Sequence, residues 1–122
     1  MLVEEIVYLN GDFVPYSRAL IPVEDRGFLF ADGIYEVVKF YGGRPFRLRA
    51  HLQRLEQSAA AIRLPLPASP AELERAALEL VDRNGLAGRD AVLYLQVTRG
   101  PARRAHAFGL RPGRRFLGEQ LL

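Results

Sequence analysis

Two basic side chains, His51 and Arg54, stand three residues apart in a stretch whose apolar residues recur with a helical period. Residues three apart project from the same side of a helix. Leu52, Leu55 and Ala59 occupy the neighbouring face, which leaves the His51/Arg54 side free to face a cleft. An arginine held on a rigid helix can bind a phosphate through two parallel N–H groups. Spacing alone, however, favours a solvated surface pair.

The segment from Ile34 to Tyr41 reads as a strand and holds a second set of candidates. Odd positions carry Tyr35, Val37, Lys39 and Tyr41, and even positions carry Ile34, Glu36, Val38 and Phe40. The odd face combines apolar bodies with polar tips, which suits a pocket wall with one anchoring hydroxyl on Tyr35. Periodicity alone favours the alternative, a half-buried core tyrosine. The even face is expected to be core, where Glu36 needs a partner because an unpaired buried charge is costly.

A third candidate pair, Arg104 and His106, follows the Gly100-Pro101 turn at the end of a predicted strand. In an extended segment, side chains two residues apart point the same way, so this pair can grip one carboxylate. A basic loop without a ligand is the simpler alternative. The chain has two histidines and no carboxylates at metal-ligand spacing beside them, so no metal site is expected.

The elements that must position these residues follow from local signals. Asn10-Gly11 predicts a hairpin turn, and Ala31-Asp32-Gly33 a turn before the strand at 34–41. The segment 45–48 is expected to return antiparallel to that strand. Helices are expected from about Arg49 to Ile62, and from Pro70, after the N-cap Ser69, to the Asn84-Gly85 stop; a strand is expected at 91–98. The order predicts an α+β fold, with two helices packed on a largely antiparallel sheet.

Composition narrows the class of protein. The 122 residues fit one domain, predicted to run from 1 to 108, followed by a divergent basic tail over 109–122. Without cysteine, disulfides, thiolate metal sites and a cysteine nucleophile are excluded. No stretch reaches the roughly 18 apolar residues of a membrane span. Acidic residues near the N-terminus, where a signal peptide is basic, predict a cytoplasmic protein.

The positive charge is almost wholly arginine, because Lys39 is the only lysine among the 17 basic residues. Five of the arginines lie between residues 103 and 115. Such a cluster could bind nucleic-acid phosphates or small carboxylates, or form a solvated tail. Nucleic acid is the less favoured partner, because stacking aromatic residues do not alternate with these arginines.

Taken together, the motifs resemble the N-terminal half of fold-type-IV, pyridoxal-phosphate-dependent aminotransferases, most closely the D-amino-acid transaminases. The similar region runs from about Tyr8 to His106. It contains Glu24–Gly27 (EDRG), Asp32–Lys39 (DGIYEVVK), the His51/Arg54 helix, Gln96–Gly100 (QVTRG) and Arg104–His106 (RAH). The resemblance implies the N-terminal domain fold of that family.

The resemblance also implies roles for individual residues. Arg54, together with His51, would bind the phosphate of pyridoxal phosphate. Tyr35, Arg104 and His106 would recognise the substrate α-carboxylate, the latter two reaching into the neighbouring subunit of a homodimer, and Val37 would line the pocket. The implied reaction transfers an amino group between a D-amino acid and a 2-oxo acid.

The chain departs from the family pattern in one respect. The Schiff-base lysine and the glutamate that faces the cofactor ring belong to the family's C-terminal half, and Lys39 matches a family lysine that is not catalytic. No catalytic residue is therefore expected here, and the chain is expected to be inactive by itself. Branched-chain L-transaminases and aminodeoxychorismate lyases share the fold and the helix motif, although Tyr35-Glu36 and Arg104–His106 favour the D-amino-acid branch. A small non-enzymatic anion- or nucleic-acid-binding module is the alternative from another class.

Overall fold

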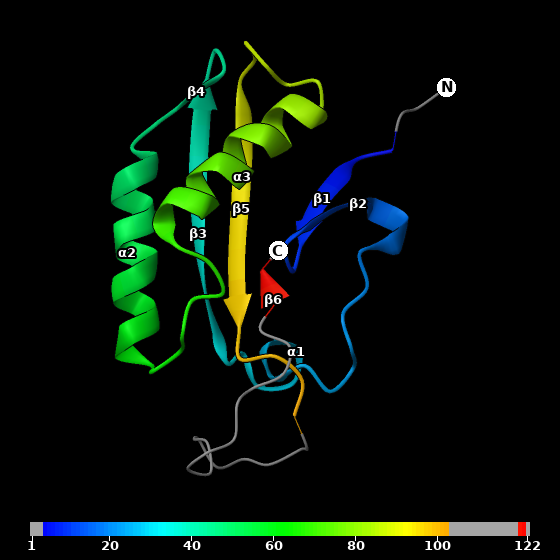
Figure 1. Cartoon of the computed structure of the whole chain (residues 1–122), viewed down its shortest axis with the longest axis vertical. Coiled ribbons are helices and arrows are strands. Elements are labelled where there is room, and N and C mark those ends of the chain that lie inside the picture. Colours follow the sequence, from blue (N-terminus) through cyan, green and yellow to red (C-terminus); the bar gives the residue numbers. More distant parts are fainter. Residues whose placement is uncertain (1–3, 103–119, 122) are drawn as a thin grey trace.

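A computed structural model of the chain describes residues 4–102 and 120–121. The elements are β1 (Ile6–Leu9), β2 (Asp12–Pro15), a 3-10 helix (Tyr16–Arg18), α1 (Arg26–Phe30), β3 (Gly33–Tyr41), β4 (Arg44–Pro45), α2 (Leu48–Ala61), α3 (Pro70–Arg83), β5 (Ala91–Thr98) and β6 (Gln120–Leu121). β1 and β2 form one sheet, and the second has the order β4-β3-β5-β6 with antiparallel neighbours. In Figure 1, α2 and α3 lie over one face of this larger sheet. The predicted α+β fold is confirmed.

The hairpin forms as predicted, with Leu9 opposite Asp12 and both turn residues, Asn10 and Gly11, at positive φ. It docks on the end of α3 through one side chain. Asn84, the C-cap of α3, accepts a hydrogen bond from the Ile6 backbone N–H at 2.9 Å and donates to the Ile6 carbonyl at 3.0 Å. One residue thus ends the helix and holds the edge of the hairpin.

Both long helices begin and end within two residues of the expected positions. At the start of α3, the Ser69 hydroxyl accepts the Glu72 N–H while the Glu72 carboxylate accepts the Ser69 N–H, so the predicted capping box is present. The strand expected at 45–48 is shorter than predicted. Only Arg44–Pro45 pairs with β3, because Arg47 adopts a left-handed φ of 56° and turns the chain into α2.

Helix α1 was not expected from the sequence. Its five residues follow the N-cap Asp25 and end at Ala31, which is left-handed with a φ of 54°. Ala31 therefore makes the turn that was expected before β3, and the strand starts at Gly33, one residue earlier than predicted. A helix this short carries too little periodicity to be recognised in a sequence.

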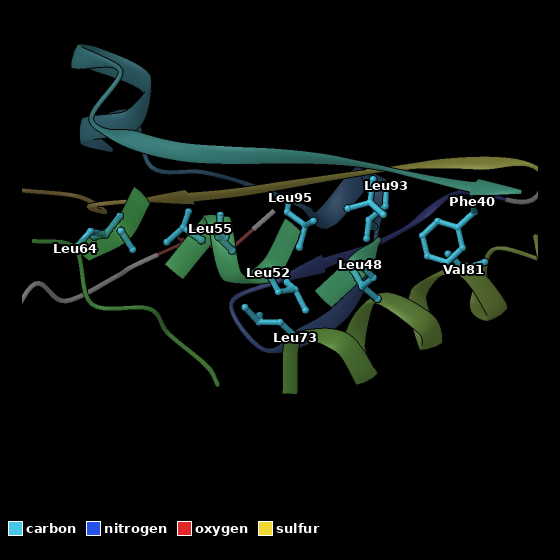
Figure 2. Close-up of a cluster of buried hydrophobic side chains, with 13 residues drawn as sticks. Phe40, Leu48, Leu52, Leu55, Leu64, Leu73, Val81, Leu93 and Leu95 are labelled. Atoms are coloured by element: carbon cyan, nitrogen blue, oxygen red, sulfur yellow. The ribbon is translucent and has the colours of Figure 1, made fainter. Parts of the chain in front are cut away.

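The core lies between the larger sheet and its two helices (Figure 2). Its buried apolar residues are Val38, Phe40, Leu48, Leu52, Leu55, Ala59, Leu64, Leu73, Ala77, Val81, Leu93, Leu95 and Val97. They include the predicted even face of β3 and most of both predicted helix stripes. The opposite face of β3 and β5 is exposed at Tyr35, Val37, Tyr41, Val92 and Tyr94. Within the described residues no helix is long and apolar enough to cross a membrane.

Candidate functional site

Glu36 is the centre of a polar cluster between β3 and α2. It points to the helix-covered face, where its side chain is only 3% exposed. Its Oε1 accepts a hydrogen bond from Arg54 Nε at 2.6 Å, and its Oε2 accepts one from Arg54 Nη2 at 2.6 Å. Oε2 also lies 2.8 Å from His51 Nδ1. The expectation that Glu36 needs a partner is confirmed, and both partners are candidates on the same side of α2.

These contacts keep the Glu36 carboxylate ionised. The hydrogen bond from Arg54 is the largest influence and lowers the pKa of Glu36, and the hydrogen bond from His51 lowers it further. Burial acts in the opposite direction, but the net pKa is below the usual glutamate value. The same contact raises the pKa of Arg54. At neutral pH, Glu36 and Arg54 therefore form an ion pair with two hydrogen bonds.

Arg54 has one edge on Glu36 and the rest of its guanidinium toward solvent. Its side chain is 66% exposed although the carboxylate that it binds is buried. A guanidinium has five N–H donors, and the Nε/Nη2 edge uses two of them on Glu36. The donors at the Nη1/Nη2 end remain for a further anion. The cluster therefore suits a phosphate group, whose oxygens accept such paired N–H groups.

Tyr35 and Val37 lie on the other face of β3, because successive side chains of a strand alternate. Tyr35 is 63% exposed, so the alternative of a half-buried core tyrosine is wrong. Its ring stacks on Tyr94 of β5, with centroids 5.6 Å apart. No hydrogen bond or ion pair links Tyr35 to Arg54 in the part of the chain that the structure describes. The structure thus joins His51 to Arg54 through Glu36, and places Tyr35 and Val37 together on the open face.

Arg104 and His106 lie outside the described residues, as do the predicted domain boundary at 108 and the basic tail. The backbone that leads to them is held by the EDRG segment. The Arg26 N–H donates to the Gly100 carbonyl at 2.9 Å, and the Ala102 N–H donates to the Glu24 carbonyl at 3.3 Å. Asp25 and Pro101 form an isolated antiparallel bridge between these contacts.

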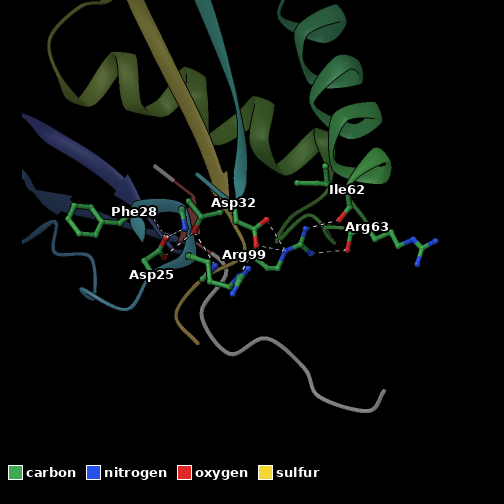
Figure 3. A network of polar contacts seen from close by, with 10 residues as sticks. Asp25, Phe28, Asp32, Ile62, Arg63 and Arg99 are labelled. Carbon is green, nitrogen blue, oxygen red and sulfur yellow. Dashed lines mark hydrogen bonds and ion pairs between the residues drawn. The ribbon is translucent and has the colours of Figure 1, made fainter. Parts of the chain in front are cut away.

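A buried ion network ties the end of β5 to the end of α2 (Figure 3). Arg99 is 1% exposed, and its Nε lies 3.0 and 2.9 Å from the two oxygens of Asp32. Its other nitrogens donate to the backbone carbonyls of Ile62 at 2.7 Å and Arg63 at 3.3 Å. Asp32 also accepts from Arg26 Nε at 2.8 Å. Sequence reasoning included these residues in family motifs but gave none of them a partner.

Asp25 extends this network to helix α1. Its Oδ1 accepts the Gly27 N–H at 2.8 Å, and its Oδ2 accepts the Thr98 hydroxyl at 3.0 Å. The Thr98 Oγ1 in turn accepts the Gly100 N–H at 3.1 Å. A Cβ on Gly27 would come within 2.7 Å of Thr98 Cβ, so glycine is required there. The signal available in the sequence was an aspartate at a possible N-cap, which is a common helix start.

Other parts of the described structure hold no competing site. A small apolar pocket between α3 and the sheet is lined by Tyr8, Leu73, Ala76, Ala77, Leu80, Leu93, Tyr94 and Leu95, and includes none of the predicted site residues. Within residues 4–102 and 120–121, no group of three histidine, aspartate or glutamate side chains is arranged to hold a metal ion.

Known proteins of similar fold include solved branched-chain aminotransferases. That of Escherichia coli superposes with a TM-score of 0.82 at 22% identity, over 98% of this chain and 40% of its own, which shows the fold alone. That of Thermoproteus uzoniensis, solved with norvaline, has a TM-score of 0.76 at 25% identity, over 98% and 39% of the two chains. A third, complexed with N-(5'-phosphopyridoxyl)-L-glutamate and from the source abbreviated T.th., has a TM-score of 0.79 at 26% identity, over 99% and 40%.

Sequence comparison reaches the same family. The D-alanine aminotransferase of Bacillus licheniformis is 48% identical over 103 residues, which is 84% of this chain and 36% of the relative. That of Staphylococcus aureus (strain MSSA476) is 42% identical over 104 residues, 85% and 36% of the two lengths. The chain thus spans little more than a third of these relatives. The family model for amino-transferase class IV matches residues 33–115, more than half of the 122 residues. On this match and the shared fold, the chain belongs to the class IV aminotransferases.

Proposed function

We propose that this chain forms the part of a pyridoxal-phosphate-dependent D-amino-acid transaminase that binds the cofactor phosphate and the substrate carboxylate. The complete protein would move an amino group from a D-amino acid to a 2-oxo acid, as a cytoplasmic homodimer. The proposal is supported by the 48% and 42% identical relatives, which are both named D-alanine aminotransferase. Because the chain spans 36% of their length, the activity is proposed for the complete protein and not for these residues alone.

The observation that carries the proposal is the outward end of the Arg54 guanidinium. A buried carboxylate holds its inner edge, and three-fifths or more of the side chain is open to a ligand. A phosphate there would receive N–H donors from a rigid helix, which gives both affinity and a fixed position. When bound, pyridoxal phosphate supplies the electron-withdrawing ring that carries the amino group between the two substrates.

The open face of β3 would meet the substrate. We propose that Tyr35 donates its hydroxyl hydrogen to the substrate carboxylate, together with Arg104 and His106 of the partner, and that Val37 lines the pocket. The exposure of Tyr35 and Val37 leaves both accessible to a ligand. Lys39 shares this face, and its Nζ lies 5.5 Å from the centre of the Tyr41 ring. We propose no role for Lys39 as the cofactor-linking lysine.

The test measures amino-group transfer in the complete protein that carries these residues. With 2-oxoglutarate as acceptor, D-alanine should be consumed and L-leucine should not. The reverse preference would favour a branched-chain aminotransferase, the class of the structural neighbours. Absence of cofactor from the purified protein would contradict both.

Two arginine variants on the same helix locate the phosphate site. Arg54→Ala should weaken binding of pyridoxamine 5'-phosphate by about tenfold or more, the effect of losing hydrogen bonds to a charged group. Arg49→Ala is the matched control, because Arg49 also lies on α2 but is highly exposed and its ion-pair partner is Glu74. Equal affinities of the Arg54→Ala and Arg49→Ala variants would refute the role of Arg54.

A further inference from the structure

We propose that Glu36 is a positioning residue that sets the orientation in which the Arg54 guanidinium meets the cofactor phosphate. The inference rests on the proposed function, and it adds a residue that makes no contact with the cofactor itself. It concerns only described residues, namely Glu36 on β3 and its two partners on α2.

The geometry separates the two edges of the guanidinium. Both Glu36 oxygens are engaged by the Nε/Nη2 edge of Arg54, each at 2.6 Å. Since the guanidinium is planar and rigid, fixing one edge also fixes the direction of the Nη1/Nη2 end. An exposed arginine without such a contact keeps many rotamers, and ordering it on binding costs conformational entropy. Glu36 removes most of that cost before the phosphate arrives.

His51 holds the carboxylate from a second direction. Its Nδ1 lies 2.8 Å from Oε2, the oxygen that also accepts from Arg54 Nη2. With a donor on each side and burial below the sheet surface, the Glu36 carboxylate cannot rotate freely. His51 is therefore inferred to act through Glu36, by keeping the carboxylate in place, and not by contact with the phosphate.

The charge of Glu36 makes this inference testable by sign. A carboxylate beside a phosphate repels it, so Glu36 would weaken phosphate binding if it acted through charge alone. Positioning acts in the opposite direction and strengthens binding. Removal of the charge therefore weakens phosphate binding if Glu36 positions Arg54, and tightens it if Glu36 acts only as a nearby anion.

The experiment measures the affinity of the complete protein for pyridoxamine 5'-phosphate and for pyridoxamine, which lacks the phosphate. Glu36→Gln should weaken binding of the phosphorylated form several-fold and leave pyridoxamine binding unchanged. In an Arg54→Ala background, Glu36→Gln should have no further effect, because its action passes through Arg54. Tighter or unchanged binding, or an equal loss in both backgrounds, would overturn the inference.

A second variant covers the case in which Glu36→Gln does not fold. Glu36→Asp keeps the charge but retracts the carboxylate by one methylene, so it should also weaken phosphate binding. Unchanged binding in a folded Glu36→Asp protein would contradict positioning. If Arg54→Ala itself leaves affinity unchanged, the proposed phosphate site fails. If Arg54→Ala weakens binding and neither Glu36 variant does, only the positioning role fails.

Discussion

Glu36 shows how a single residue can conflict with its strand and still be explained. The alternation of β3 assigns it to the buried face beside Val38 and Phe40, where a carboxylate requires compensation. Two donors on α2 provide that compensation, and one of them, Arg54, remains largely exposed. The arrangement connects the core to the surface, so that a feature of folding is also a feature of the candidate site.

The lowered pKa of Glu36 predicts a pH-dependent contribution to stability. A carboxyl group whose pKa is lower in the folded state, through Arg54 and then His51, stabilises the fold above its unfolded pKa of about 4.3. That contribution is lost as pH falls through the lower, folded pKa. Between about pH 5 and pH 3, the wild-type chain should therefore lose more free energy of unfolding than Glu36→Gln, as measured by urea denaturation.

Glu79→Gln is the control for this measurement. Glu79 pairs with Arg83 on the exposed side of α3, where an ion pair contributes little. Its acid limb should follow that of the wild type. If the Glu36→Gln curve also follows the wild type, the pH dependence comes from other carboxyl groups.

At the scale of elements, Arg99 joins three parts of the fold that are distant in sequence. Its guanidinium connects Asp32, before β3, with the carbonyls of Ile62 and Arg63 that follow α2. Carbonyls at the end of a helix have no partner within the helix, so a buried cation there satisfies them. Gly33 adds a close approach at the same end of the sheet, where a Cβ would lie 2.7 Å from the Val97 carbonyl oxygen.

Arg99→Met should therefore destabilise the chain by about 3–5 kcal/mol, the usual effect of breaking a buried ion pair. The substitution keeps an apolar side chain of similar length but leaves Asp32 and two carbonyls without their donor. Arg63→Met is the matched control, since the Arg63 side chain is exposed, and it should change stability by less than about 0.5 kcal/mol. Similar denaturation midpoints for both variants would contradict a structural role for the network.

At the scale of the whole molecule, the larger sheet is covered on one face only. The uncovered face carries Tyr35, Val37, Tyr41, Val92 and Tyr94. Contiguous exposed apolar surface of this kind marks interaction sites in proteins. The face also holds two of the proposed substrate-binding residues, so that association and substrate binding would involve the same surface.

We therefore expect the 122-residue chain to associate with other copies through this face. Val92 is 62% exposed on it, and Val92→Lys should shift the mass measured by light scattering toward the monomer. Leu78→Lys places the same charge at an exposed position on α3, on the other side of the sheet, and should leave the mass unchanged. A wild-type chain that stays monomeric at high concentration would contradict this expectation.

Local signals in the sequence determined much of the fold. Asn10-Gly11 specified the hairpin, and Ser69, Pro70 and Glu72 specified the start of α3, because each acts through backbone geometry within a few residues. The alternation of β3 separated the open face with Tyr35 from the core face, and it identified Glu36 as a residue that needs a partner. The resemblance to a family then singled out Arg54, although no local rule did so.

Tertiary structure alone decided which groups meet. The partners of Glu36 lie 15 and 18 residues away, and those of Arg99 lie 36, 37 and 67 residues away. Such contacts depend on how α2 lies against the sheet, which is set by the packing of the whole core and not by propensity at either residue. For the same reason the sequence predicted a buried charge without its partner, and an arginine on a helix without the carboxylate that orients it.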